Sequence, residues 1–226
     1  MSQTVEMHII ARIHSDFPTK FGIPRQSGLA DVPARIVFEP EYRNADALRG
    51  IEGFSHLWLI WQFSAAVREG WSPTVRPPKL GGNKRIGVFA TRSPFRPNEI
   101  GLSSVRLDRV EPNTPDGPVL HISGADLMDG TPIFDIKPYL AYTDSHPEAL
   151  GGFALTTDAV RVECPASLLE KLPQERRQTL LNVLAQDPRP GYQHEPGRVY
   201  GFPFAGFEVK FTVEGDLLTV LQIESR

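Results

Sequence analysis

Apolar residues occur in short runs up to Leu140, some of them alternating with polar residues, as half-buried strands do. Gly, Pro, Asn or Asp bounds each run, as expected where turns join strands. The predicted strands are His8–Ile13, Ala34–Phe38, Phe54–Phe63, Arg85–Thr91, Gly101–Val110, Val119–Ser123 and Ile133–Leu140. Short strands at this spacing predict a closed or strongly curved sheet and argue against a doubly wound α/β fold.

The pattern changes toward the C-terminus. Apolar residues repeat at three- and four-residue intervals across Pro165–Gln186, which is the period of a helix. Pro173 lies inside this segment, so the pattern predicts either a kink or two helices in series. The runs Phe207–Val213 and Leu217–Ile223 are separated by a Glu-Gly-Asp turn and predict a hairpin.

These elements predict a mainly β domain at residues 1–145 and a small α+β domain at residues 146–226. Composition agrees, since 40% of the residues are hydrophobic and 23% are charged, as in soluble globular proteins. The N-terminal segment lacks the basic and apolar regions of a signal peptide. The longest apolar run, Phe54–Phe63, is too short to span a bilayer. We therefore expect a cytoplasmic protein.

The sequence gives little support to metal or disulfide chemistry. Cys164 is the only cysteine, which excludes an intrachain disulfide and a cysteine-rich metal site. The histidines do not pair at the spacing of metal ligands, so no metal is expected. Asp126, Asp129 and Asp135 lie close together in the sequence and suit a metal, a ribose or a cationic ligand. Ordinary turn chemistry explains these aspartates equally well.

Charge is unevenly distributed, although the net charge is only −3. Eight basic and two acidic residues lie between Arg76 and Arg109, so the rest of the chain is acidic. A positive region on an acidic body predicts a selective polyanion binder; a solvated basic loop is the alternative. Within this region Ala90–Gly101 holds two prolines around Arg92 and Arg96, a rigid turn suited to bind an anion or stack on a base. An ordinary proline-rich connector would look the same.

Seven motifs, spread over nearly the whole chain, together resemble one known family. They are Pro24–Gln26, Gly53–Trp58, Trp71–Asn83, Gly87–Asn98, Asp129–Pro132, Asp135–Tyr139 and Ala185–Pro190. In these motifs the chain closely resembles the TsaA-like family, the tRNA threonylcarbamoyl-adenosine N6-methyltransferases. The long central motif is highly specific.

The resemblance implies a single-sheet β-barrel that binds S-adenosylmethionine without a glycine-rich dinucleotide loop. The residues implied to hold this methyl donor are Pro24, Arg25, Gln26, Ser64, Ala65, Arg92, Leu102, Asp126, Leu127, Met128 and Asp129. Ser64 and Ala65 depart from the longer polar pair of the family, so their contacts are expected from the backbone. The resemblance also implies a homodimer in which the Asp187–Pro190 motif reaches toward a site completed by the partner.

The implied substrate is the threonylcarbamoyl-modified adenosine next to the anticodon of threonine tRNA. Its reacting nitrogen belongs to a ureido group and is more acidic than a plain amine, and the sequence identifies no catalytic base. The residues expected to contact tRNA are Arg76, Lys84, Arg85, Arg96, Arg189 and Tyr192. Two other functions remain open: a non-catalytic RNA-binding or regulatory module on the same fold, and a donor-binding enzyme that acts on a small molecule.

Overall fold

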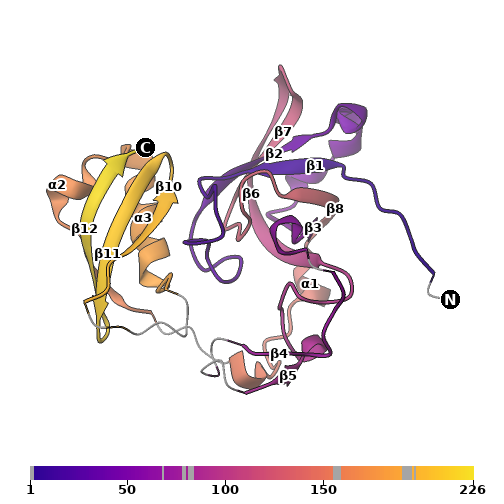
Figure 1. The fold of residues 1–226 in the computed structure, drawn as a ribbon. Coiled ribbons are helices and arrows are strands. Elements are labelled where there is room, and N and C mark those ends of the chain that lie inside the picture. The colour runs from indigo at the N-terminus through magenta and orange to yellow at the C-terminus, as the bar shows by residue number, and fades with distance from the viewer. Residues whose placement is uncertain are drawn as a thin grey trace.

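A closed antiparallel barrel forms the first part of the chain (Figure 1). The computed structural model describes residues 3–67, 69–77, 80, 84–154, 159–189, 195 and 197–226. Within these ranges, six strands close the barrel in the order β1-β2-β7-β6-β3-β8. Their bounds are β1 Ala11–His14, β2 Pro33–Phe38, β3 His56–Gln62, β6 Ile100–Thr114, β7 Gly117–Ser123 and β8 Pro132–Pro138. The predicted closed sheet is confirmed.

Alternation along the strands fills the barrel core. In β3, Leu57, Leu59 and Trp61 point inward and are buried, whereas Trp58 and Ile60 point outward and stay partly exposed. The same alternation in the neighbouring strand β6 directs Val105 inward and Leu102 outward. The outer face of these two strands therefore carries apolar side chains that the barrel core does not use.

The strand predicted at Arg85–Thr91 is wrong for most of its length. Within the described residues, strand β5, Ile86–Gly87, pairs only with β4, Thr74–Val75, and a 3₁₀ turn at Val88–Ala90 follows. The Thr91 amide and hydroxyl both donate to the Val88 carbonyl, at 3.1 and 2.8 Å, and close this turn. The prediction at His8–Ile13 is displaced, because the ladder between β1 and β2 begins only at Ala11.

Short helical segments lie between the barrel strands and after the last of them. The 3₁₀ turns lie at Pro40–Tyr42, Ala45–Leu48, Ile51–Gly53, Ser64–Ala66 and Gly152–Ala154, and the one-turn helix α1 lies at Ala141–Asp144. No helix in the described ranges is long and apolar enough to cross a membrane.

A second sheet with its own helices follows. In the described part of the chain its four strands run in the order β10-β11-β12-β9, with β9 parallel to β12. The bounds are β9 Arg161–Glu163, α2 Ala166–Leu169, α3 Gln174–Ala185, β10 Tyr200–Phe204, β11 Phe207–Glu214 and β12 Leu217–Ser225. The predicted hairpin is β11–β12. Pro173 caps α3, so two helices in series occur where the leucine pattern was found.

The connection between β1 and β2 packs against the second sheet. Phe17, Ala30 and Val32 are buried in the same apolar cluster as the C-terminal strands and α3. Asp16 lies 2.9 Å from Arg176 of α3 in an ion pair. In Figure 1 this connection, drawn in indigo, lies between the barrel and the C-terminal sheet. The domain boundary between residues 145 and 146 stays a prediction. The connection between β1 and β2 precedes that boundary in the sequence, yet it packs in the core of the C-terminal sheet.

Candidate functional site

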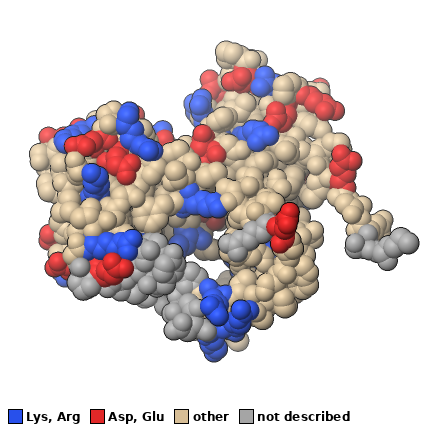
Figure 2. Space-filling view, in the orientation of Figure 1, with Lys and Arg blue, Asp and Glu red and all other residues tan. Residues whose placement is uncertain are grey.

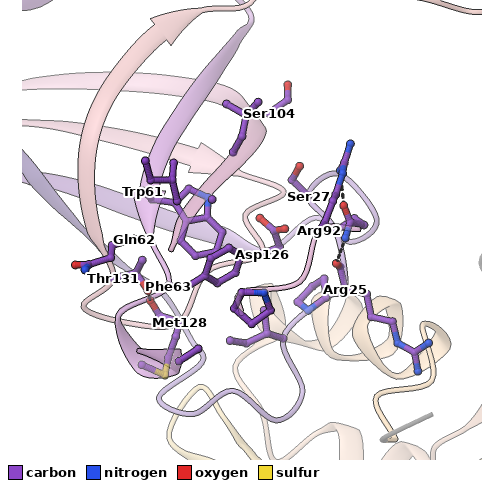
Figure 3. Close-up of a pocket in the computed structure, with 18 of the residues that line it drawn as sticks. Arg25, Ser27, Trp61, Gln62, Phe63, Arg92, Ser104, Asp126, Met128 and Thr131 are labelled. Carbon is purple, nitrogen blue, oxygen red and sulfur yellow. Dashed lines mark hydrogen bonds between the residues drawn. The ribbon is translucent and has the colours of Figure 1, made fainter. Parts of the chain in front are cut away.

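A cavity of about 1040 Å³ lies against the outer face of β3 and β6 (Figure 3). The rest of its wall comes from the connection after β1 at residues 23–28, Ser64–Ala66, the turn that carries Arg92, the segment between β7 and β8 with Asp126 and Met128, and Tyr139 and Asp144 after β8. Segments from five places in the sequence therefore meet at one site.

Part of the cavity wall is apolar and aromatic. Trp61 and Phe63 pack edge to face with ring centroids 4.3 Å apart. Leu102 projects from the outer face of β6 and is 57% exposed. A leucine with this exposure at a concave surface favours an apolar ligand group, such as the face of a purine ring.

A partly buried carboxylate faces the same cavity. Asp126 accepts a hydrogen bond of 2.5 Å from the Ser103 hydroxyl, which in turn accepts one of 3.0 Å from the Trp61 indole N–H. Burial raises the pKa of Asp126, while the Ser103 hydroxyl, the Ser27 amide and the Arg92 charge act in the opposite direction. In Figure 3 Asp126 lies between the aromatic pair and Arg92. Such a carboxylate is suited to bind a cationic or hydroxyl group.

Three side chains link the cavity to the C-terminal part of the chain. Arg92 donates to the side-chain oxygen of Gln26, and the Gln26 amide donates to the Arg25 carbonyl. The Arg25 guanidinium then donates to the carbonyl oxygens of Asp187 and Arg189, at 3.0 and 3.1 Å. The position of the cavity loop is therefore coupled to the turn after α3.

That turn is held by an ion pair of its own. Arg189 is only 9% exposed and donates to both carboxylate oxygens of Asp187, at 2.8 Å each. Burial acts to raise the pKa of Asp187, but the bonds and charge of Arg189 outweigh it and lower this pKa below its usual value. Asp187 adopts a positive φ of 47°, a strained conformation for a residue with a side chain, which the ion pair helps to hold.

Most of the residues expected to hold the methyl donor line this cavity. They are Pro24, Arg25, Gln26, Ser64, Ala65, Arg92, Leu102, Asp126 and Met128. Leu127 is buried in the barrel core, because its side chain points inward. Asp129 accepts from the Ser15 amide at 3.1 Å and lies 3.4 Å from His14. The role of each residue in donor binding stays a prediction.

The three neighbouring aspartates do not converge on one point. Asp126 bonds Ser103, Asp129 bonds Ser15, and Asp135 pairs with Lys137 at 2.9 Å. Among the described residues, no group of three or more His, Cys, Asp or Glu side chains is placed to hold a metal ion.

Comparison with known proteins agrees with this architecture. The family model described as tRNA-methyltransferase O N-terminal domain matches residues 12–145, and the TrmO C-terminal domain model matches residues 157–226. The chain belongs to the tRNA-methyltransferase O family. This confirms the resemblance noted in the sequence motifs.

Individual relatives match over most of their length. The tRNA (adenine(37)-N6)-methyltransferase of Escherichia coli K12 is 42% identical over 228 residues, covering 96% of this chain and 97% of that one. The crystal structure of TrmO from Pseudomonas aeruginosa has a TM-score of 0.80 at 35% identity and covers 100% of this chain and 99% of that one. A Methanothermobacter thermautotrophicus chain named "Probable S-adenosyl-L-methionine-binding protein" is 34% identical over 141 residues, 62% of this chain and 94% of that one.

The residues expected to contact tRNA lie in three settings. Arg76, Lys84 and Arg85 are exposed around β4 and β5, where Figure 2 shows basic side chains gathered at the lower end of the molecule. Arg96 lines the cavity, but its guanidinium braces the turn by donating to the Thr91 and Ser93 carbonyls, at 2.9 and 3.3 Å. Arg189 is held by Asp187, and Tyr192 lies outside the described residues.

Sequence reasoning missed several residues of the site. Trp61, Phe63, Tyr139 and Asp144 line it, and Ser103 lies behind the lining, where it bonds Trp61 and Asp126. Asp144 accepts a bond of 2.8 Å from the Trp58 indole. A serine at an inward position of a strand was the available signal for Ser103, because a buried hydroxyl needs a partner.

Proposed function

We propose that the chain is an S-adenosylmethionine-dependent methyltransferase that acts on the N6 nitrogen of the adenosine at position 37 of tRNA. Its family membership and the cavity against β3 and β6 support this function, and the tRNA methyltransferase from Escherichia coli covers nearly the same length. The finer proposal is that the accepted base is threonylcarbamoyl-adenosine in threonine tRNA. We further propose that the enzyme is a cytoplasmic homodimer with domains at residues 1–145 and 146–226.

The cavity suits the proposed donor in size and in chemistry. Its volume of about 1040 Å³ is at the upper end of the range for small-molecule sites. Leu102 and Phe63 would pack against a purine ring, and Asp126 would accept from a hydroxyl or a cationic group. Arg92 would pair with a carboxylate. When bound, S-adenosylmethionine supplies an electrophilic methyl group.

Positioning is the main contribution that these residues make to the reaction. A donor and an acceptor fixed in line react as parts of one molecule, which removes much of the entropic cost of their meeting. The loop that carries Pro24, Arg25 and Gln26 is tied to Arg92 on one side and to the turn at Asp187 on the other. The ureido nitrogen of the modified base is more acidic than a plain amine, so we propose that it reacts without a strong base.

Methyl transfer from labelled S-adenosylmethionine to tRNA with and without the threonylcarbamoyl group tests the proposal. Transfer confined to modified tRNA, lost in Arg92→Ala, is the expected result. Arg109→Ala is the matched control, because Arg109 is exposed on β6 and pairs with Glu111 at 3.1 Å, away from the cavity.

The other outcomes each point to a different function. Equal methyl transfer to tRNA without the threonylcarbamoyl group would contradict the proposal that threonylcarbamoyl-adenosine is the accepted base. Donor binding without transfer to any tRNA would favour an enzyme that acts on a small molecule. Absence of donor binding by the wild-type chain would leave an RNA-binding or regulatory module. Sedimentation of the wild-type chain as a monomer would contradict the homodimer.

A further inference from the structure

Two large aromatic side chains lie exposed beside one another, outside both cores. Trp71 is 54% exposed and Phe89 is 73% exposed. Their ring centroids are 6.2 Å apart and their planes are inclined by 30°, so the rings are stacked on each other. Aromatic residues of this size usually bury most of their surface, and an exposed stacked pair points to a ligand that covers it.

The backbone under this pair is held in place. Val88, next to Phe89, is buried, and its amide donates to the Pro73 carbonyl at 2.9 Å. This bond joins Pro73, two residues after Trp71 and directly before β4, to the 3₁₀ turn that carries Phe89. Arg92, which lines the cavity, comes only one turn later in the chain. The pair therefore stands on a backbone that is held in place, and Phe89 lies three residues before Arg92 in the sequence.

The surroundings of the pair are strongly basic. Residues 69–96 carry six basic side chains and one acidic one, Glu69. Arg76, Lys84 and Arg85 are exposed next to β4 and β5, and Figure 2 shows basic side chains at this end of the molecule. The Arg85 guanidinium donates to the Thr74 hydroxyl at 2.8 Å, which directs this cation along the hairpin.

We propose that Trp71 and Phe89 form a stacking platform for an unpaired base of the anticodon loop, with the neighbouring cations holding its phosphates; this rests on the proposed function. Bases of single-stranded loops stack on aromatic side chains, and a positive groove follows their backbone. The same surface fits a second copy of the chain poorly. A symmetric contact would place like charges against each other, and protein interfaces are depleted of charge at their centre.

Binding of a modified anticodon stem–loop RNA to the full chain tests the platform. Trp71→Ala and Phe89→Ala should each weaken Kd by about 5- to 150-fold, the range for loss of one stacked base. Trp71→Phe keeps a ring and should retain most of the affinity. Tyr142→Ala removes an exposed aromatic on α1, 88% exposed, and should leave Kd unchanged.

Salt dependence separates stacking from charge. The slope of log Kd against log salt should be unchanged in Trp71→Ala, and it should fall by about one in Arg76→Ala. Both variants should melt at the wild-type temperature, because both side chains are exposed.

Failure of the platform differs from failure of the proposed function. If the wild-type protein does not bind the RNA, the proposed tRNA methyltransferase function is contradicted. Wild-type binding with unchanged Kd in both alanine variants would overturn the platform alone. A change of oligomeric mass in either variant would overturn it in favour of a contact between two copies of the chain.

Discussion

The Ser103 hydroxyl holds together the buried polar chain behind the cavity, and its removal is the sharpest test of the site. Ser103 accepts from Trp61 at 3.0 Å and donates to Asp126 at 2.5 Å. Ser103→Ala leaves a buried indole N–H without an acceptor and a partly buried carboxylate without its hydroxyl donor. Both groups then carry a desolvation cost that the hydrogen bonds had offset.

The expected loss of stability follows from these two bonds. An unsatisfied buried donor costs about 1–3 kcal/mol, and a hydrogen bond to a charged group contributes about 1.5–3 kcal/mol. Because the two effects share one hydroxyl and are not additive, we expect a loss of about 3 kcal/mol. In a chain of this length that lowers the melting temperature by about 6–12 °C.

The loss should depend on pH in a defined direction. Burial raises the pKa of Asp126, so ionisation of the native carboxylate lowers stability as pH rises through its folded pKa. The Ser103 hydroxyl counteracts this shift. Without the hydroxyl the pKa rises further, so the difference between variant and wild type should be largest at neutral pH and smaller in acid.

Thermal unfolding at neutral and acidic pH, together with donor titration, measures both effects. Ser123→Ala is the matched control, because Ser123 is also a buried strand serine that donates to an aspartate, Asp108, but away from the cavity. Donor affinity should fall in Ser103→Ala and stay unchanged in Ser123→Ala. Equal losses of stability in the two variants, or a loss in Ser103→Ala that does not change with pH, would refute the reasoning.

Three further changes test neighbouring contacts. Arg25→Ala removes two bonds to carbonyls of the C-terminal turn and should lower stability by about 1–2 kcal/mol; unchanged amide-exchange protection in that turn would contradict it. Asp126→Asn removes a carboxylate whose pKa is raised by burial, so at neutral pH the variant should melt at a higher temperature than the wild type. The variant should also bind the donor more weakly, and a titration that finds full donor affinity would count against the site. Gly101→Ala places a methyl group 2.2 Å from the Trp61 ring and should cost about 1–3 kcal/mol in chemical denaturation, whereas Gly87→Ala meets open space and should be nearly neutral; equal effects would show that the ring yields.

The barrel was predictable because its strands carry their own local signal. In β3, Leu57, Leu59 and Trp61 occupy one face in strict alternation, and the pattern alone directs them inward. The C-terminal hairpin was also predictable, because two apolar runs flank a Glu-Gly-Asp turn in which Gly215 has a φ of 59°.

Two strands of the second sheet had no such signal. Strand β9, Arg161–Glu163, has one apolar residue and exists because it pairs in parallel with β12, far along the chain. Strand β10 contains Pro203, which argues against a strand. Proline is tolerated there because β10 is at the edge of the sheet and, in the part of the chain that the structure describes, pairs only with β11.

The site was visible in part. Arg92 and Asp126 stand in motifs dense enough to single out, and both line the cavity. The contact from Arg25 to the carbonyls of Asp187 and Arg189 joins positions that are 162 and 164 residues apart in the sequence. Hydrogen bonds to backbone atoms also leave no trace in the pattern of side chains.

The connection between β1 and β2 also determines how domains can be exchanged between related proteins to make a chimera. The core of the C-terminal sheet includes Phe17, Ala30 and Val32. In the sequence these residues lie between two barrel strands, β1 and β2. A chimera made by joining one barrel to another C-terminal sheet would place these side chains against a foreign core. A chimera of this kind must therefore take both the C-terminal sheet and the connection between β1 and β2 from the same parent. These two parts are in contact in the structure but are encoded by two separate stretches of the gene.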